Sequence, residues 1–295
     1  MARVAVVGPG SVGVFFAGHL AAAGHDVVAC ARRPFDRYVI ESQQFPLDIE
    51  ANVVVDPAEI TETAEWVLLS VKAHQTPGAA PWLNALCDSN TRVMILQNGI
   101  EHDLADEYVN GADTIPTVVY CGAGLQDPGH ILHTSSGHLI VPDEPHGDDM
   151  VALFANSKAE VRPSNDYVTP AWMKLSMNVT LNGLTALTGR KIPVIGDLAI
   201  RPVAIDLVAE CWQVARADGA DLDPADAEKT VDAIIARNLD EGTSMYFDTQ
   251  AGRPTEHDAI HGAALRRAEH HGIDTPTIRV VHALLDARNR IHESE

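Results

Sequence analysis

The segment 172–182 carries a lysine and two asparagines at four-residue intervals, Lys174, Asn178 and Asn182. In an α-helix this spacing places all three side chains on one face. The residues between them are largely apolar, which predicts a helix that is mostly buried. Desolvation lowers the pKa of a lysine, and such a lysine is suited to donate a proton near neutral pH. The alternative interpretation is a polar stripe on the surface of the helix.

A glycine-rich segment lies between a short apolar run at 4–7 and a helix-like stretch at 14–23, and its residues are Gly8, Pro9, Gly10, Ser11, Val12 and Gly13. A strand, G-x-G-x-x-G and a helix in this order form the dinucleotide-binding fingerprint. Its glycines permit a tight turn, close approach of the backbone to a pyrophosphate, and close packing of helix on strand. The free N–H groups at the helix N-terminus then bind phosphates. The alternative is a glycine turn that serves packing only.

Two adjacent arginines, Arg32 and Arg33, follow a predicted strand at 25–30. In an NAD-binding unit an acidic residue grips the ribose 2′-hydroxyl at this point. Here the first acid is Asp36, and an arginine suits a 2′-phosphate instead. The sequence therefore favours NADP over NAD, and the alternative is a solvated turn.

Two further polar residues follow central strands of the predicted sheet. Lys72 ends the strand 66–71, and Asn98 follows the strand 92–96 and precedes a glycine. Side chains at the carboxyl ends of parallel strands face the ligand. Each residue alone is an ordinary loop or turn residue, but together beside a nucleotide fingerprint they are candidates for the site.

A third polar group lies between positions 243 and 258. Ser244 can donate a hydrogen bond to a carboxylate, and Glu256 can bind a hydroxyl or orient Lys174. The alternative is a loop followed by a helix cap, because Thr255 and Asp258 have the spacing of a capping box.

Two histidines in the same region, His257 and His261, stand four residues apart, a spacing that can chelate a metal on a helix. No third ligand is evident beside them, although His270 and His271 follow. We therefore expect no metal site, and we interpret these histidines as surface or site residues.

The composition describes an acidic globular chain. Among 295 residues, 41 are acidic and 21 basic, which gives a formal net charge of −20, and 46% are hydrophobic. This charge disfavours nucleic acids and anionic membranes as partners, and no apolar run reaches the ~18 residues of a membrane span. The first predicted strand begins at position 4, so we expect no signal peptide. The four cysteines are scattered, so we expect reduced thiols and a cytoplasmic protein.

The first half of the sequence alternates between predicted strands and helices. Besides the strands already named, the pattern predicts further elements, namely strands at 53–55 and 117–120, a helix at 78–86, a β-hairpin at 129–141 with Gly137 at its bend, and an edge strand at 159–162. Such alternation predicts an α/β domain with a doubly wound parallel sheet of the Rossmann type.

The second half of the sequence has a helical pattern. We predict amphipathic helices at 170–189, 197–218, 224–239, 256–271 and 277–290, with Gly272 as a C-cap and Pro276 as a restart. The chain is therefore expected to have two domains. The first, over 1–165, is a Rossmann domain that binds NADP, and the second, over 166–295, is an all-helical domain for substrate binding and dimerisation.

Taken together, these residues resemble the ketopantoate reductase (2-dehydropantoate 2-reductase) family over nearly the whole chain. The matching motifs are G-x-G-x-x-G at 8–13, V-K-A around Lys72, Asn98-Gly99 and W-x-K-x-x-x-N-x-x-x-N at 172–182. Two further blocks match, T-S-M-x-x-D-x-x-x-G-R-x-T-E-x-D-x-I at 243–260 and G-I-x-T-P at 272–276. These two blocks are specific, because a generic Rossmann protein is not expected to carry both.

The resemblance implies NADPH-dependent reduction of a small 2-keto acid, with 2-dehydropantoate (ketopantoate) reduced to pantoate in pantothenate and coenzyme A biosynthesis. It implies that Lys174 is the proton donor. It further implies that the substrate contacts Asn178, Asn182 and Ser244. The cofactor is implied to contact the glycine loop at 8–13 and four polar residues, Arg32, Lys72, Asn98 and Glu256, of which Asn98 also lies near the substrate.

The sequence departs from the family pattern at two positions that bear on the substrate. Ile192 stands where the family often has a further substrate-binding asparagine, and His261 replaces the asparagine of E-x-D-x-I-N-G. The expected partner is a small-molecule substrate, and a homodimer is also considered. The alternative functions are an NADP-dependent reductase of another 2-keto acid and a non-catalytic NADP-binding sensor, which would not need the donor Lys174.

Overall fold

The computed structural model describes residues 1–237 and 239–293. Two compact units are present. The N-terminal unit consists of Met1–Gln97 and His102–Tyr167, and the helical unit consists of Asn98–Glu101 and Val168–Glu295. The short segment Asn98–Glu101 therefore packs with the helical unit although elements of the N-terminal unit flank it in sequence.

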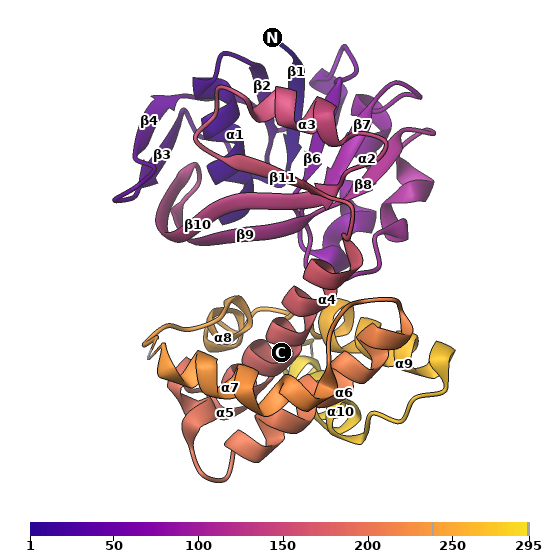
Figure 1. The fold of residues 1–295 in the computed structure, drawn as a ribbon. Helices are drawn as coiled ribbons and strands as arrows, with labels where there is room; N and C mark the ends of the chain where they lie inside the picture. The colour runs from indigo at the N-terminus through magenta and orange to yellow at the C-terminus, as the bar shows by residue number, and fades with distance from the viewer. Residues whose placement is uncertain (238, 294–295) are drawn as a thin grey trace. The chain divides into compact units, whose positions relative to one another are not determined.

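A six-stranded parallel sheet forms the centre of the N-terminal unit (Figure 1). In spatial order its strands are β5 (Asn52–Val54), β2 (Asp26–Cys30), β1 (Arg3–Val7), β6 (Trp66–Leu69), β7 (Arg92–Ile95) and β8 (Asp113–Pro116). The order reverses between β1 and β6, which is the switch point of a doubly wound sheet. The predicted α/β fold class is thus confirmed, and the apolar runs that predicted β1, β6 and β7 are the strands buried on both faces.

A second sheet in this unit has the order β11-β10-β3-β4, with β9 paired to β10. Its strands are β3 (Arg37–Glu41), β4 (Leu47–Glu50), β9 (Val118–Asp127), β10 (His130–Pro142) and β11 (Glu160–Ser164). Helix α1 (Ser11–Ala22) packs against strands of both sheets, whereas α2 (Thr76–Leu86) contacts β1 and α3 (Gly147–Phe154) contacts β11 (Figure 1).

The hairpin predicted at 129–141 is wrong in its position. Residues of that range belong to a single strand, β10, which pairs in antiparallel fashion with the preceding strand β9. The turn between them contains Gly129, whose φ is +76°. Gly137 is needed for a different reason, because a Cβ there would lie 2.7 Å from Cζ of Phe15 on α1.

In the helical unit, the single helix predicted at 170–189 is wrong, because the π turn Asn178–Asn182 divides it into two helices. The other four predicted helices are present with shifted ends, and one helix is additional. The helices of this unit are α4 (Val168–Met177), α5 (Gly183–Thr188), α6 (Arg201–Ala217), α7 (Ala227–Ala236), α8 (Ser244–Gln250), α9 (Ala263–His271) and α10 (Pro276–Glu293). The helix predicted at 224–239 extends past α7, and position 238 lies outside the described residues. Helix α8 is the additional one. No helix in the described ranges has a stretch that is long and apolar enough to cross a membrane.

Two π-helical turns interrupt this unit. One, η4 (Asn178–Asn182), joins α4 to α5, and the other, η7 (Asp258–Gly262), leads into α9. A π turn accommodates one extra residue per turn and occurs often at functional sites. Short 3₁₀ turns complete the described elements, at Pro57–Glu59, Ala73–Gln75, Asp103–Tyr108, Ile192–Gly196 and Pro224–Asp226.

Helix α6 lies at the centre of the helical core. Its buried Leu207, Cys211 and Trp212 belong to one apolar cluster with residues of α4, α5 and α10. The buried Glu210 of the same helix accepts hydrogen bonds from the backbone N–H groups of Thr277 and Ile278, both at 2.9 Å. A carboxylate at a helix N-terminus satisfies free N–H groups and the helix dipole, so Glu210 fixes the start of α10.

The capping box predicted from Thr255 and Asp258 is wrong. The N–H of Thr255 donates to Oδ1 of Asn289 at 3.2 Å, and its hydroxyl donates to the same atom at 3.1 Å. The carboxylate of Asp258 instead pairs with Arg266 at 3.0 Å. The helical backbone begins at His257, and the N–H of Ile260 donates to the carbonyl oxygen of Glu256 at 3.1 Å, so Thr255 and Asp258 do not stand at the cap positions.

Candidate active site

The glycine loop after β1 has the geometry that each of its glycines requires. Gly8 has a φ of +82°, and a Cβ there would lie 2.4 Å from Cγ1 of Val71. A Cβ on Gly13 would lie 2.5 Å from Oγ of Ser70. A Cβ on Gly10 would have no neighbour nearer than 4.0 Å. The first and third glycines are therefore fixed by packing, whereas the second leaves the backbone open to a ligand.

The start of α1 offers free N–H groups beside this loop. Gly10 is the N-cap residue, no side chain caps the helix, and no acidic residue stands in the first turn. First-turn N–H groups have no partner within a helix, so those of Ser11, Val12 and Gly13 suit a phosphate. Pro9 has no N–H group, but it precedes these three residues and leaves their N–H groups in place.

Ser70 braces the glycine loop from the end of β6, a role that the sequence did not suggest. Its hydroxyl lies 2.8 Å from the carbonyl oxygen of Gly8 and 3.2 Å from that of Val7, and it donates to them. The only sequence signal was a serine at the carboxyl end of a central strand. The loop is therefore held in shape before any ligand arrives.

Two cations of the N-terminal unit follow its strands. Arg32, directly after β2, is exposed and has no hydrogen bond or ion pair with a residue in the described part of the chain. Lys72 is half-buried at the start of a 3₁₀ turn. Gln97, which the sequence analysis did not single out, donates from Nε2 to the carbonyl oxygen of Val71 at 3.1 Å and to Oγ1 of Thr76 at 2.8 Å. These bonds connect Val71 and Thr76, which stand on either side of Lys72 in the sequence.

Three of the predicted residues form a hydrogen-bonded chain in the helical unit. Nδ2 of Asn98 donates to Oε2 of Glu256 at 3.0 Å, and Nδ2 of Asn178 donates to Oδ1 of Asn98 at 3.3 Å. Glu256 is buried, while Asn98 and Asn178 are half-buried. The structure thus brings together residues that are 80 and 158 positions apart in sequence.

The helix that carries Lys174 is buried over the whole segment 171–182, in which no residue is exposed. Lys174 itself is half-buried on α4. Asn182, in the π turn, is only 4% exposed, and its side chain makes no hydrogen bond with any residue in the described ranges. Buried polar groups are normally satisfied, so this amide is available to a ligand.

Ser244 is exposed at the first position of α8. The N-cap residue Thr243 accepts a hydrogen bond from the N–H of Tyr246 at 3.1 Å, and its hydroxyl lies 2.8 Å from that of Thr185 on α5. Helix α8 also contacts the π turn of Asn182. These contacts fix Ser244 relative to the turn that carries Asn178 and Asn182.

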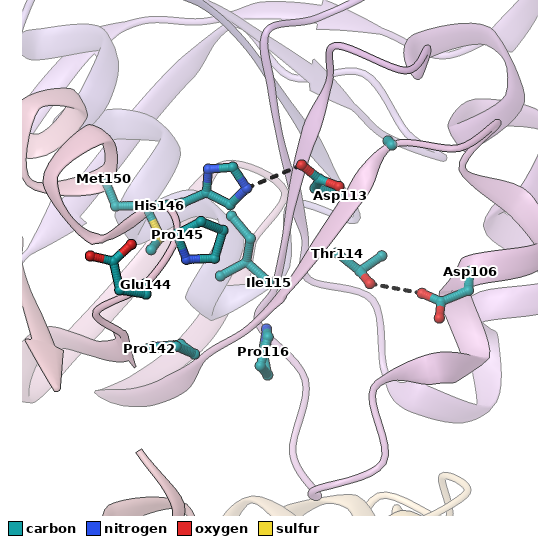
Figure 2. A pocket seen from close by; sticks show the side chains of 11 residues that line it. Asp106, Asp113, Thr114, Ile115, Pro116, Pro142, Glu144, Pro145, His146 and Met150 are labelled. Carbon is teal, nitrogen blue, oxygen red and sulfur yellow. Dashed lines mark hydrogen bonds and ion pairs between the residues drawn. The ribbon is translucent and has the colours of Figure 1, made fainter. Parts of the chain in front are cut away.

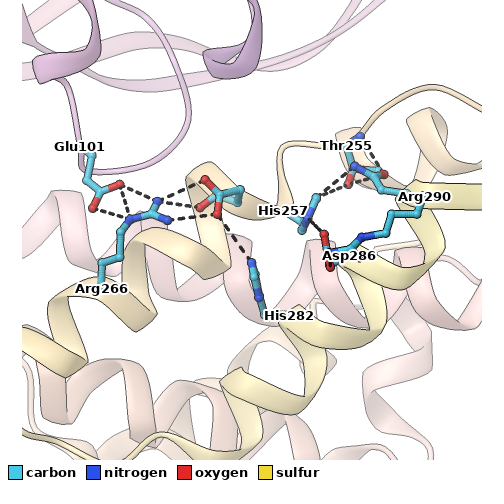
Figure 3. Close-up of polar contacts among 9 residues, drawn as sticks. Glu101, Thr255, His257, Arg266, His282, Asp286 and Arg290 are labelled. Carbon is cyan, nitrogen blue, oxygen red and sulfur yellow. Dashed lines mark hydrogen bonds and ion pairs between the residues drawn. The ribbon is translucent and has the colours of Figure 1, made fainter. Parts of the chain in front are cut away.

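Arg266 anchors the segment that carries Asn98 (Figure 3). Its Nε lies 2.9 Å and its Nη2 2.7 Å from the carboxylate of Glu101, and Nη1 lies 3.0 Å from Asp258. Hydrogen bonds to Glu101 raise the pKa of Arg266. A Cβ on Gly99 would lie 2.5 Å from the carbonyl oxygen of Ala259. No motif in the sequence indicates this anchor.

The histidines considered as metal ligands have other partners. Nε2 of His261 lies 2.8 Å from the carbonyl oxygen of Val179, and Nδ1 of His257 lies 3.2 Å from Oγ1 of Thr255. His271 pairs with Asp218. Within the residues that the structure describes, no group of three or more histidine, cysteine or acidic side chains is arranged to hold a metal ion.

A separate hollow of about 360 Å³ lies beside the edge strand β8 of the N-terminal unit (Figure 2). His146 lies 3.1 Å from Asp113 across it, and Thr114 donates to Asp106 at 2.8 Å. None of the predicted site residues lines it. The hollow is therefore distinct from the glycine loop and from the asparagine chain.

Comparison with known proteins places these features in context. Residues 4–145 match the family model "Ketopantoate reductase PanE/ApbA", and residues 166–289 match "Ketopantoate reductase PanE/ApbA C terminal". A protein of Caulobacter vibrioides named 2-dehydropantoate 2-reductase is 36% identical over 293 residues, 97% of this chain and 99% of that protein.

Solved structures give the same result. The crystal structure of a PanE/ApbA family ketopantoate reductase from Ralstonia eutropha has a TM-score of 0.87 at 30% identity and covers 98% of this chain and 99% of its own. A dimeric ketopantoate reductase from Staphylococcus aureus has a TM-score of 0.85 at 25% identity, with 98% and 99% of the two chains covered.

Proposed function

The chain belongs to the ketopantoate reductase family of oxidoreductases, and we propose that it reduces 2-dehydropantoate to pantoate with NADPH. The observation that carries this proposal is the chain of Asn178, Asn98 and Glu256 together with the buried, unpartnered amide of Asn182. These groups stand on or beside the helix of Lys174. They offer amide donors and acceptors to a small, polar, anionic substrate.

NADPH is the cofactor of this family, as the sequence predicts for this chain. We assign the pyrophosphate to the N–H groups at the start of α1 and the 2′-phosphate to Arg32. The open side of Gly10 supports the first assignment, and the exposed guanidinium of Arg32 supports the second. Lys72, Asn98 and Glu256 complete the proposed cofactor contacts.

Lys174 is the proposed proton donor. When bound, NADPH supplies the hydride that adds to the carbonyl carbon at C2 of the keto acid. Negative charge then develops on the carbonyl oxygen, and an ammonium group stabilises it and transfers a proton to that oxygen. The product is a 2-hydroxy acid, and Lys174 recovers its proton from water.

The remaining polar residues of the helical unit orient the substrate in this proposal. Asn178 and Asn182 bind the hydroxyl and keto oxygens, and Ser244 donates to the carboxylate. Asn98 accepts from Asn178 and donates to Glu256, so it links substrate-side and cofactor-side groups. Because an amide has both donors and an acceptor, Asn98 can serve both.

Reduction of another 2-keto acid is the second candidate function. Ile192, which stands where the family often has an asparagine, is buried in the helical core and only 9% exposed. It offers no hydrogen bond to a substrate hydroxyl. A more apolar keto acid would lose less binding free energy than ketopantoate when isoleucine stands in place of this asparagine.

We further infer a division of labour along the chain, with cofactor binding in 1–165 and substrate binding and dimerisation in 166–295. The dimeric relative from Staphylococcus aureus supports a homodimer. The cysteines, Cys30, Cys87, Cys121 and Cys211, are free thiols, which supports the proposed cytoplasmic location.

A panel of keto acids tests the proposed function. The purified protein would be assayed for NADPH oxidation with ketopantoate, pyruvate, 2-ketoisovalerate and phenylpyruvate. The proposal expects the highest kcat/KM with ketopantoate. A tenfold preference for another keto acid would favour the second candidate, and no oxidation with any of them would reject both.

A further inference from the structure

His261 connects the two π turns of the helical unit. It lies in η7, and its Nε2 is 2.8 Å from the carbonyl oxygen of Val179 in η4, although the two residues are 82 positions apart. Val179 directly follows Asn178 and precedes Asn182 by three positions. The hydrogen bond therefore acts on the backbone that carries both substrate-side asparagines.

The ring of His261 is completely buried, with 0% of the residue exposed. Burial lowers its pKa to about 3, so the ring is neutral at physiological pH. Because the carbonyl oxygen of Val179 only accepts, the proton of the neutral ring lies on Nε2. The other nitrogen, Nδ1, is buried without a hydrogen-bond partner in the described ranges. The ring thus contributes one directed N–H.

Gly183, the residue after the π turn, provides the space for this ring. A Cβ at Gly183 would lie 2.6 Å from Nε2 and 3.3 Å from Cε1 of His261. Real Cβ atoms do not approach other atoms this closely, so either the ring or the helix would have to move. The histidine and the glycine therefore fit each other.

A π turn needs an external reason to persist, because it replaces regular α-helical bonds with a wider and less common turn. In η4 the side chain of His261 supplies such a reason, because it donates a hydrogen bond to the carbonyl oxygen of Val179 from outside the turn. If that bond were lost, a return of the turn to α-helical geometry would rotate Asn182 relative to Lys174. The orientation of the substrate amide thus depends on the histidine.

We propose that His261 is a positioning residue that holds the turn Asn178–Asn182 in its π conformation and so aims the substrate-binding asparagines. This inference rests on the proposed function for its kinetic consequence, but the structural link between His261 and the turn is independent of the substrate.

Two variants of His261 separate hydrogen bonding from packing. His261→Leu keeps an apolar side chain of similar size without a donor, and His261→Gln keeps an N–H at about the same reach. Loss of one buried hydrogen bond changes affinity by about tenfold. We expect His261→Leu to raise the KM for ketopantoate about tenfold, with the Kd for NADPH unchanged within twofold. His261→Gln should recover most of the loss.

A third variant reaches the same bond without altering the histidine. Gly183→Ala should displace the ring and raise the KM for ketopantoate as His261→Leu does. Gly78→Ala on α2 is the matched control, because a Cβ there has no neighbour within 4 Å. If His261→Leu does not fold, Gly183→Ala and His261→Gln still decide the question.

Amide hydrogen exchange provides a readout that does not need the reaction. In His261→Leu and Gly183→Ala, exchange over 178–184 should accelerate at least tenfold while the rest of the helical core stays protected. This result would stand even if the wild-type protein failed to reduce ketopantoate, an outcome that rejects the proposed function alone. Unchanged exchange over 178–184 in both variants would overturn the role of His261. Equal kinetic loss in His261→Gln and His261→Leu would overturn it as well.

Discussion

Lys174 is the residue on which the proposed chemistry depends most. In the proposed mechanism the ammonium of Lys174 stabilises the developing oxyanion and supplies the proton, so Lys174→Ala should lower kcat by ~10²-fold or more. The Kd for NADPH should stay the same, since the proposed cofactor contacts lie elsewhere. Steady-state kinetics and a fluorescence titration measure the two quantities.

A surface lysine provides the control for this substitution. Lys229 on α7 has a side chain that is 84% exposed, and Lys229→Ala should leave kcat unchanged. If Lys174→Ala retained near-normal kcat on the best keto acid, the donor would be another group, and Glu256 would be tested next.

Arg32 sets the expected preference for NADPH. Removing one charge-assisted hydrogen bond costs about 1.5–3 kcal/mol, which corresponds to a ten- to hundredfold change. Arg32→Ala should therefore raise the KM for NADPH by this factor and leave the KM for NADH nearly unchanged. Arg33→Ala, one position along the same exposed turn, is the matched control. Equal use of the two cofactors by the wild-type protein would refute the assignment.

At the scale of elements, the segment Asn98–Glu101 depends on Arg266. The pair of Arg266 and Glu101 is partly exposed, with side-chain exposures of 46% and 29%, so its loss should change the free energy of unfolding by less than about 1 kcal/mol. Arg266→Ala should nevertheless lower kcat/KM several-fold, because Asn98 loses its anchored backbone. Activity and urea unfolding measured together separate the two effects.

The control for Arg266 is an ion pair of the same type without a link to the site. Arg279 pairs with Asp274 at 2.7 Å on the surface of the helical unit. Arg279→Ala should change neither activity nor stability by a measurable amount. A similar loss of kcat/KM in both variants would mean that Arg266 has no special role.

The sequence predicts elements well where a local pattern decides them. β1, β6 and β7 are continuous apolar runs, and Gly272 and Pro276 mark a helix end and a helix start. The short strand β3 has charged ends that obscure its alternation, and the seven-residue α8 gives too short a period to read. Both were missed for lack of local signal.

The candidate site shows a different limit. Its residue types were visible in motifs, because Lys174, Asn178 and Asn182 share a regular spacing. The contacts that fix them are long-range, such as the bond between His261 and Val179 and the pair of Arg266 and Glu101, which spans 165 positions. No local pattern encodes a π turn that is held from a distant helix.

At the scale of the whole molecule, two features concern charge, namely the acidic composition of the chain and its buried neutral histidines. The net charge of −20 comes from residues spread along the chain and disfavours anionic ligands except at local cations. Each unit also contains a buried neutral histidine, His19 in the N-terminal unit and His261 in the helical unit. Burial lowers the pKa of His19 to about 4 and that of His261 to about 3.

These two histidines should make both units less stable in mild acid. The unfolded chain binds a proton at each near pH 6.5, whereas the folded chain does not, so the free energy of unfolding falls as pH falls below the unfolded pKa. The loss continues down to the folded values near 4 and 3. Between pH 7 and pH 5 each of these two histidines should lower the free energy of unfolding by about 1 to 2 kcal/mol. Urea unfolding at pH 7, 6 and 5 measures this slope.

Glutamine variants test whether the slope comes from these rings. His19→Gln and His261→Gln should each flatten the dependence on pH, because the unfolded state then gains one proton fewer. The exposed His270 is the control, and His270→Gln should leave the slope unchanged. Paired carboxylates, such as Asp218 and Asp258, have lowered pKa values and act at lower pH. A slope that persists unchanged in a variant lacking both His19 and His261 would place the acid sensitivity elsewhere.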